Sequence, residues 1–242
     1  MTRFFTILLL ALGFCTSAQI IKIDTLKLPP SQRFNDLQTD KMNYPIIKTG
    51  NQKTDSLINY DLKNAFTNNE YPTNTIDSTL IKWADDGIIF LDFTVTYCQN
   101  NIISLNINAE GCGAYCSSWT DYFNYSTLTG KALNLNDIVD TVGDFRKLVY
   151  QQANTQYDKN IANLKAMMMD KTSDIDTATY NWALEFCTNC QKSMHLRQFA
   201  LYPTYLEVIE ICALPHMIQN LTPSIDLKYN YADIKKYSKI KN

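Results

Sequence analysis

The chain carries two kinds of hydrophobic periodicity, and the first of them predicts a helix near residue 54. Apolar side chains at Ile58, Leu62, Ala65 and Phe66 recur at steps of three and four residues. That spacing places them on one face of an α-helix. Thr54 or Asp55 can cap the first turn, so we expect an amphipathic helix that begins there and buries this stripe.

A period of two residues dominates residues 77–109 and predicts strands. Asp86-Gly87 makes a turn between two β-rich runs, and residues 99–101 make the next turn. Apolar residues alternate with polar ones at positions 91, 93, 95 and 97 and again at 103, 105 and 107. Alternation of this kind is typical of strands with one buried face. We therefore predict a three-stranded antiparallel meander over residues 77–109.

The later part of the chain repeats both periods. A further strand spans residues 119–126 and ends at a turn formed by Thr129-Gly130. Helical spacing follows over 145–152 and 161–168, and the methionines at 167–169 are interpreted as core-filling. A hairpin that turns at Pro203-Thr204 and a last strand leading into a short helix close the chain. This order favours an α+β fold, in which helices pack on one face of an antiparallel sheet made of a meander plus a closing hairpin.

The N-terminus has the features of a secretory signal. Residues 1–18 contain Arg3, then a run of apolar residues, then small ones, which is the arrangement of an export signal. Cleavage after Ala18 suits this pattern, whereas a lipoprotein cut before Cys15 would need a small residue where Phe14 stands. We expect export to the periplasm or the cell exterior. No later apolar run approaches the ~18 residues of a spanning helix, so we expect no membrane span after cleavage.

Length and charge limit what the mature chain can be. Removal of residues 1–18 from a chain of 242 leaves about 224 residues, and the net charge changes from −2 to about −3 because Arg3 is lost. No basic patch indicates a nucleic-acid partner. No linker-like segment interrupts the chain, so we expect one large domain or two closely packed lobes.

Six cysteines remain after cleavage, and an even number in an exported chain favours disulfides. They are Cys98, Cys112, Cys116, Cys187, Cys190 and Cys212. Cys98 and Cys112 bracket one strand and are too far apart to bond. Cys212 is the preferred partner of Cys112 or Cys116, and Cys187-x-x-Cys190 is interpreted as a local structural disulfide. A thiol-redox pair is the alternative, but the chain lacks the βαβ frame of such motifs.

A zinc site is a second alternative for part of this set. Cys112, Cys116, Cys212 and His216 would supply the three thiolates and one imidazole of a closed tetrahedral site, on two segments that would then be neighbours. An oxidising compartment converts thiols to disulfides before zinc can hold them. We therefore expect no metal and no other cofactor.

The chain offers few residues for catalysis. Neither of its two histidines, His195 and His216, lies in a recognisable nucleophile motif, and no glycine-rich phosphate loop is present. Carboxylates that could serve a glycosidase occur at Asp92, Glu110, Asp121, Glu207 and Glu210. Nothing in their spacing selects a pair. A non-enzymatic protein is favoured, with an enzyme acting on cell-wall polysaccharide as the alternative.

Three segments together resemble the RsiV-type extracytoplasmic domain. SLNINAEGCGAYCSSWTDYFNYSTLTGKALNLNDIV, at 104–139, combines an aromatic-rich strand with the phrase T-G-K-x-L-x-L-x-D that opens a helix. NYPIIKTGNQKTDSLINYDLKNAF is similar to the short domain that precedes it, and FALYPTYLEVIEICALPHMIQNLTPSIDLKYNYADI is similar to the closing hairpin. The resemblance covers residues 40–237. It implies an N-terminal strand and helix subdomain at 19–75 and an RsiV-type α+β domain at 76–242.

The resemblance also implies a binding function in the cell envelope. The family includes the lysozyme-binding ectodomain of the anti-sigma factor RsiV and domains attached to peptidoglycan deacetylases of the PdaC type. No sigma-binding segment with its membrane helix and no deacetylase domain is found, so signalling and deacetylation are not carried over. We expect a lysozyme-like muramidase or a peptidoglycan fragment as partner, contacted by Tyr115, Trp119 and Tyr122.

The chain departs from the family pattern at several positions. Tyr115 stands where the family phrase tends to have histidine, and Asn220 stands where a glycine is usual. The cysteines at 112, 116, 187, 190 and 212 look like additions. If the turn at 111–116 contacts a ligand, this is where the protein differs from its relatives.

Overall fold

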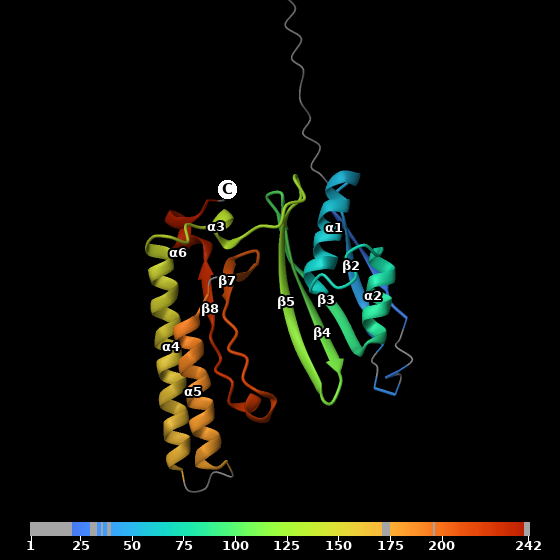
Figure 1. Ribbon diagram of the computed structural model, residues 1–242. Coiled ribbons are helices and arrows are strands. Elements are labelled where there is room, and N and C mark those ends of the chain that lie inside the picture. The colour runs from blue at the N-terminus through green and yellow to red at the C-terminus, as the bar shows by residue number, and fades with distance from the viewer. Residues whose placement is uncertain are drawn as a thin grey trace, which may run out of the picture.

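The computed structural model describes residues 21–29, 33–34, 36–37, 40–170, 175–195 and 197–239. The predicted signal at 1–18 lies outside these residues. The α+β prediction is confirmed: helices combine with antiparallel strands in a two-stranded sheet, β1-β2, and two three-stranded sheets, β3-β4-β5 and β6-β7-β8 (Figure 1). The meander and the closing hairpin therefore belong to separate sheets, and each sheet has its own helices.

The first lobe contains the elements from β1 to β5. They are β1 (Lys22–Lys27), β2 (Asn43–Lys48), α1 (Gln52–Phe66), α2 (Ile76–Asp85), β3 (Ile88–Gln99), β4 (Ile102–Cys112) and β5 (Cys116–Ser126). α1, α2 and β2 cover one face of the β3–β5 sheet, where buried Ile103, Leu105 and Ile107 meet the helices (Figure 1). This packing crosses the boundary between 75 and 76, which stays a prediction.

α1 confirms the predicted helix and most of its buried stripe. The helix begins at Gln52, because the Asn51 side chain accepts hydrogen bonds from the first free N–H groups. Ile58, Leu62 and Phe66 are buried as expected, but Ala65 is exposed. Lys63 is buried in its place and its Nζ donates to two backbone carbonyls of the loop that follows, at 3.2 and 3.1 Å.

The prediction of a first strand over residues 77–85 is wrong, because this segment is the helix α2. Thr75 caps it, and the buried residues Thr79, Leu80 and Ala84 lie on one helical face. The meander consists instead of β3, β4 and β5. Its first turn is at Asn100 and Asn101, as predicted, and both have positive φ values of 51° and 58°, as a tight hairpin turn requires.

The second lobe contains the elements from α3 onward. They are α3 (Leu135–Ile138), α4 (Asp144–Met169), α5 (Thr177–Ser193), β6 (Gln198–Leu201), β7 (Tyr205–Ile209), η1 (His216–Leu221), β8 (Leu227–Asn230), α6 (Tyr231–Ile234) and η2 (Lys235–Tyr237). α4 lies across the β6–β8 sheet and buries Phe145, Val149 and Ala153 against it. α4 and α5 form a long helical hairpin on the side away from the first lobe (Figure 1).

Two predictions about α4 need correction. The two helical stretches are one continuous helix of 26 residues. The methionines at 167–169 do not fill a core: Met168 packs against the α4–α5 core, but Met167 is exposed and Met169 is 75% exposed. They lie in the last turn, where fewer elements surround the helix. No helix among the described residues is long and apolar enough to cross a membrane.

The two lobes join where β6 meets the inner face of the β3–β5 sheet. The Asn124 side chain donates to the Phe199 carbonyl at 2.8 Å, and the Leu201 N–H donates to Ser104 Oγ at 3.0 Å. These four groups are buried. The inner faces of the two three-stranded sheets therefore point toward each other, with helices on the outside (Figure 1).

Candidate functional site

The structure contains two disulfides, and their pairing corrects the prediction. Cys112 is bonded to Cys116 and Cys190 to Cys212. Cys212 therefore does not pair with Cys112 or Cys116, and Cys187-Cys190 is not a local disulfide. Cys98, exposed, and Cys187, buried, are free thiols although both were disulfide candidates. The physical reason is register: Cys112 lies opposite Cys116 at the end of the β4–β5 hairpin, and Cys190 faces the chain after β7.

The zinc alternative is wrong in its chemistry but right about which segments are neighbours. The rings of Tyr115 and His216 lie 4.6 Å apart, so the β4–β5 hairpin tip and the start of η1 are in contact. All three cysteines of the proposed set are in disulfides and supply no thiolate. The described residues contain no cluster of three histidine, cysteine or acidic side chains suited to a metal ion.

The three predicted binding aromatics do not share one surface. Tyr115 is 60% exposed at the hairpin tip. Trp119 lies on the face of the sheet that carries the helices and packs against the core of the first lobe. Its ring meets that of Trp83 edge-on at 6.0 Å. Tyr122 lies on the opposite, inner face of β5, because side chains alternate along a strand. Whether any of them binds a ligand stays a prediction.

The inner face of the β3–β5 sheet is a half-buried row of amide and hydroxyl groups. Asn106 lies opposite Tyr122, and Asn108 lies opposite Thr120. Thr120 donates to Asn108 Oδ1 at 2.8 Å, and Asn108 donates to Asn106 Oδ1 at 3.3 Å. Among the described residues, the Asn106 amide nitrogen and the Tyr122 hydroxyl have no hydrogen-bond partner.

A hollow of about 290 Å³ lies on this face, beside Asn108 and Thr120. Its other lining residues are Phe90, Ala109, Glu110, Ser118 and Trp119. The hollow thus lies next to Asn106 and Tyr122 along the paired strands, without including them in its lining. Sequence reasoning missed this row, although its signal is visible: the polar positions that alternate with Ile103, Leu105 and Ile107 are a serine at 104 and asparagines at 106 and 108, with no charged residue among them.

The second lobe faces this row with a polar cluster on its own sheet. Glu207 lies 3.7 Å from the Lys228 ammonium, and the Tyr202 hydroxyl donates a hydrogen bond to Glu207. The rings of Tyr202 and Tyr205 stack at 4.4 Å. Burial, and then the charge of Glu207, raises the pKa of Tyr122. Tyr122 and Glu207 therefore interact across the space between the sheets, and Tyr122 remains a neutral donor.

The five carboxylates considered for catalysis have separate surroundings. Burial acts to raise the pKa of Asp92, but hydrogen bonds from Lys41 at 3.0 Å and Asn43 at 3.3 Å outweigh it and lower that pKa. Burial raises the pKa of Asp121 on the outer face of β5.

The other three carboxylates, Glu210, Glu207 and Glu110, do not form a catalytic pair either. Burial raises the pKa of Glu210, and the Tyr157 hydroxyl, at 2.9 Å, partly offsets this effect. Glu207 is paired with a lysine, and Glu110 lines the hollow described above. No hydrogen bond joins any two of these five carboxyl groups, all of which the structure describes.

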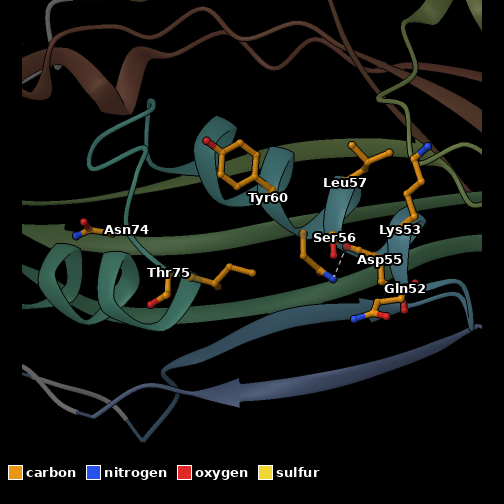
Figure 2. A pocket seen from close by; sticks show the side chains of 10 residues that line it. Gln52, Lys53, Asp55, Ser56, Leu57, Tyr60, Asn74 and Thr75 are labelled. Atoms are coloured by element: carbon orange, nitrogen blue, oxygen red, sulfur yellow. Dashed lines mark hydrogen bonds between the residues drawn. The ribbon is translucent and has the colours of Figure 1, made fainter.

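Another hollow, of about 850 Å³, lies along the outer side of α1 and is open to solvent (Figure 2). Leu57 and Tyr60 line it and are both exposed. Two of its polar groups are already used: Asp55 accepts from the N–H and the hydroxyl of Thr49, both at 2.6 Å, and the Tyr60 hydroxyl donates to the Pro72 carbonyl at 3.1 Å. Gln52, Lys53 and Ser56 also line it. We take the inner face as the candidate because its polar row is continuous along two paired strands.

Comparison with known proteins identifies the fold. No family model and no curated protein matches the sequence. The chain is similar to the crystal structure of a member of the DUF3298 family from Bacteroides fragilis, with a TM-score of 0.52 and 14% identity over 90% of this chain and 93% of that chain. A DUF3298 family protein from Pseudomonas aeruginosa gives a TM-score of 0.48 and 14% identity over 91% and 95%.

The first of these comparisons defines the class of protein by its fold. At 14% identity a shared architecture is what the likeness establishes. The chain is an α+β protein with the fold of a DUF3298 family member, stapled by two disulfides. The finer RsiV-type assignment rests on the sequence resemblance.

Proposed function

We propose that the mature chain is an exported, non-enzymatic binding protein of the cell envelope that takes a cell-wall glycan between its two three-stranded sheets. The observation that carries this proposal is the half-buried inner face, where the Asn106 amide and the Tyr122 hydroxyl have no partner among the described residues. Both residues are half-buried, and the hollow of about 290 Å³ opens on the same face, at the neighbouring pair Asn108 and Thr120. A ligand that lies along this face completes the hydrogen bonds of both groups.

The chemistry of the row matches that of a sugar chain. Each sugar hydroxyl both donates and accepts, and so do an asparagine amide and a tyrosine hydroxyl. The Tyr122 ring and the stacked rings of Tyr202 and Tyr205 add flat apolar surface with a polar end. Asn108 and Thr120 already bond to each other and hold the floor in place.

Export is supported by the signal-like residues 1–18 and by the two disulfides, which are typical of oxidising compartments. The resemblance to the RsiV-type domain supports an envelope location. The expected mature protein begins at Gln19. Mass analysis of the protein recovered from the envelope and culture medium tests this, and a full-length mass with residues 1–18 retained would contradict it.

Calorimetric titration with purified muropeptides tests the glycan proposal. We expect saturable binding, and we expect Asn106→Ala and Tyr122→Phe each to weaken it about three- to tenfold, since each removes one hydrogen bond. Asn163→Ala, on the exposed side of α4, and Tyr60→Phe, in the α1 groove, are the matched controls. Absence of binding at high micromolar concentration, or an equal loss in the controls, would rule the proposal out.

A lysozyme-like muramidase is the second candidate partner, favoured by the hairpin tip. Tyr115 is 60% exposed there and Met217 beside His216 is 83% exposed, and the Cys112–Cys116 bond restrains the tip. Exposed aromatic and methionine side chains on a restrained surface are typical interface anchors. For this partner, Tyr115→Ala and Met217→Ala should reduce capture by immobilised lysozyme, while Asn106→Ala should not.

The non-enzymatic part of the proposal has its own test. Intact peptidoglycan is incubated with the protein, and the supernatant is examined by mass spectrometry. We expect the same fragments as in a buffer control. Newly released saccharides would instead support the polysaccharide-acting enzyme.

A further inference from the structure

A second polar hollow, outside the inner face, gathers most of the arginine of the described chain. It has a volume of about 250 Å³ and is lined by Thr141, Arg146, Tyr150, His195 and Arg197. The structure describes three arginines, and two of them are here, in a chain whose net charge is −2. Arg146 comes from the first turn of α4, and His195 and Arg197 come from the segment between α5 and β6.

The Arg146 guanidinium is held in place, and neither Arg146 nor Arg197 is neutralised by an ion pair. Arg146 lies over the Tyr150 ring at 5.1 Å, and the Tyr150 hydroxyl is fixed by donating to the Met194 carbonyl at 3.2 Å. The Arg197 backbone N–H donates to the His195 carbonyl at 2.9 Å. All ion pairs found in the described part of the chain use lysines. The donors of both guanidiniums are thus free for a ligand.

The position of Arg146 is electrostatically unfavourable unless an anion is nearby. It lies at the N-terminus of a 26-residue helix, where the helix dipole repels cations. The capping residue, Gly143, offers no side chain to the free N–H groups. Two acids of this segment have other partners: Asp144 pairs with Lys147 at 3.2 Å, and Asp140 accepts from the Val142 N–H at 3.1 Å.

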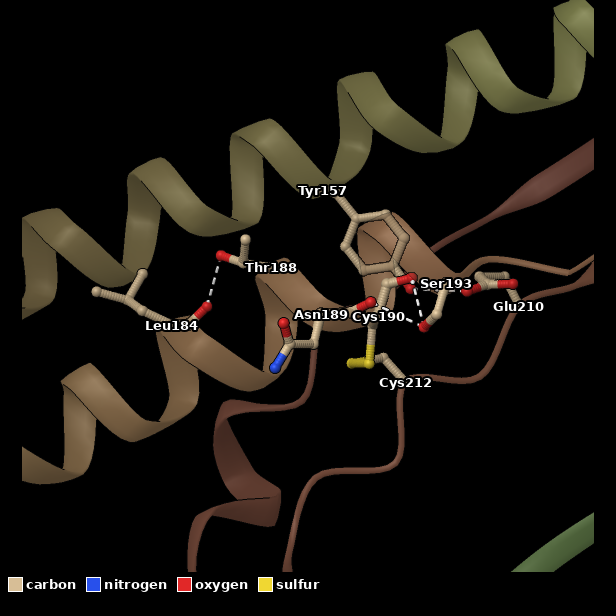
Figure 3. The surroundings of a disulfide bond; sticks show 8 residues. All are labelled: Tyr157, Leu184, Thr188, Asn189, Cys190, Ser193, Glu210 and Cys212. Carbon is tan, nitrogen blue, oxygen red and sulfur yellow. Dashed lines mark hydrogen bonds between the residues drawn. A yellow bond between two sulfur atoms is a disulfide. The ribbon is translucent and has the colours of Figure 1, made fainter.

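An adjoining hollow of about 310 Å³ shares His195 and Arg197 with the first and extends to the Cys190–Cys212 disulfide. Figure 3 shows Ser193, Cys190 and Glu210 along its wall, with Tyr157 reaching from α4. Gln198 also lines it, and its buried Oε1 atom has no hydrogen-bond partner. A ligand with an anionic group in the first hollow has room here for a hydroxyl-bearing remainder.

We propose that Arg146, Arg197 and His195 bind the phosphate group of a phosphorylated ligand. Two guanidiniums and an imidazole approach the same space and together offer more donors than the two oxygens of a carboxylate can accept. A phosphate presents three or four oxygens and suits arginine donors in pairs. The site is distinct from the inner face and does not depend on the glycan proposal.

Titration of the mature protein with inorganic phosphate, followed by NMR of the arginine side-chain N–H signals, tests the site at about 0.15 M salt. We expect saturable shifts in Arg146 and Arg197 and a loss of affinity of about tenfold or more in Arg146→Gln and Arg197→Gln, because each removes a charge-assisted hydrogen bond. Lys147→Gln, on the same helical turn, is the control for charge alone and should bind nearly as the parent does. All three side chains are exposed, and thermal unfolding confirms that the variants fold.

Two outcomes overturn the proposal: shifts that stay linear with concentration, or affinities that are the same in the arginine variants as in the parent. Acetate binding as tightly as phosphate would overturn the assignment to phosphate. A comparison of vesicles of phosphatidylglycerol in phosphatidylcholine with vesicles of pure phosphatidylcholine distinguishes a lipid headgroup from a free phosphorylated molecule as the ligand. Capture by the first that is lost in Arg197→Gln indicates a lipid headgroup, and phosphate binding without vesicle capture indicates a free phosphorylated molecule.

Discussion

Neighbouring residues of β5 have opposite surroundings, and the difference follows from the two-residue period of a strand. Trp119 and Phe123 point outward and pack on the core of the first lobe. Asp121 lies between them on the same face, where burial raises the pKa of its carboxyl and a hydrogen bond from Trp119 lowers it in part. Tyr122, one residue later, faces the second lobe. One position along this strand thus decides whether a side chain belongs to a core or to the candidate site.

Asp121 should make the free energy of unfolding depend on pH. Its folded-state pKa is raised above the ordinary value of 3.8, so the folded protein holds this proton more tightly than the unfolded chain. Stability therefore falls as the pH rises from 3.8 through the raised pKa, and the cost is fully present at neutral pH. Asp121→Asn should be at least as stable as the parent at about pH 7 and should lose this part of the pH dependence.

Urea unfolding at about pH 4 and pH 7 measures this effect. Asp36→Asn, an exposed residue of the N-terminal loop, is the control and should leave the difference between the two pH values unchanged. A clear loss of stability at neutral pH in Asp121→Asn would show that the carboxylate is needed in its charged form.

The two free thiols should differ in reactivity. Cys98 is exposed and Cys187 is buried, and burial raises the pKa of both. A maleimide should label one site in the folded protein and a second only after unfolding. Intact mass should show two disulfides in the purified chain. A third disulfide, with no free thiol, would contradict the structure.

At the scale of elements, the turn after β5 illustrates how a local signal serves a distant contact. The Gly130 N–H donates to the Ser126 carbonyl at 2.8 Å and closes the turn that Thr129-Gly130 predicts. Its φ is +75°, and the missing side chain leaves room for α1: a Cβ atom would lie 2.9 Å from Leu57 Cβ and 3.1 Å from the Thr54 carbonyl oxygen. The glycine therefore satisfies both the turn and the packing of a helix on the sheet.

Gly130→Ala should lower the free energy of unfolding by about 2 kcal/mol or more, because a left-handed conformation and a close contact are both penalised. Gly50→Ala separates the two effects. Gly50 has a φ of +83°, and a Cβ there would meet nothing within 4 Å, so its cost should be about 1 kcal/mol. Equal losses in the two variants, measured by urea unfolding, would mean that α1 does not restrict this turn.

At the scale of the whole molecule, the lobes are joined by side chains that complete another element's backbone. β6 is a short strand at the edge of its sheet. Its Phe199 carbonyl accepts a hydrogen bond from Asn124, and its Leu201 N–H donates one to Ser104, both in the first lobe. A second contact, between Tyr115 and His216, lies at the far end of the β4–β5 hairpin. The row of amides that forms the candidate site lies between these two junctions. The distance between the two sheets at the site therefore depends on both contacts.

Asn124→Ala should reduce stability by about 1–3 kcal/mol, because the buried Phe199 carbonyl loses its donor. Ser104→Ala should have a similar effect through the Leu201 N–H. Ser118→Ala, an exposed hydroxyl on the same sheet, is the matched control and should change little. If urea unfolding shows no loss in either buried variant, the lobes are not held together by these bonds.

Elements with a strong local pattern were predictable, and ambiguous ones were not. The stripe of α1, the alternation of β3 and β4 and the Pro203-Thr204 hairpin all follow from spacing within a dozen residues. Residues 77–85 form a short segment of mixed polar and apolar residues, so spacing alone could not separate a strand from the helix α2. The break expected within residues 145–168 is absent because α4 packs along its length on α5 and the β6–β8 sheet.

The division between local pattern and tertiary structure is clearest at the cysteines and the candidate site. Periodicity, turn residues and the even number of cysteines were enough for the α+β class, for most strands and for the expectation of disulfides. They could not decide the bonds Cys112–Cys116 and Cys190–Cys212, because a disulfide requires α-carbons within about 7 Å, and distances between remote segments are a property of the folded chain. The same holds for Tyr122 near Glu207 and for Arg146 beside Arg197. The residue types are visible in the sequence, but the first pair meets only through the packing of the two lobes, and the second only through the packing of α4 on the segment between α5 and β6.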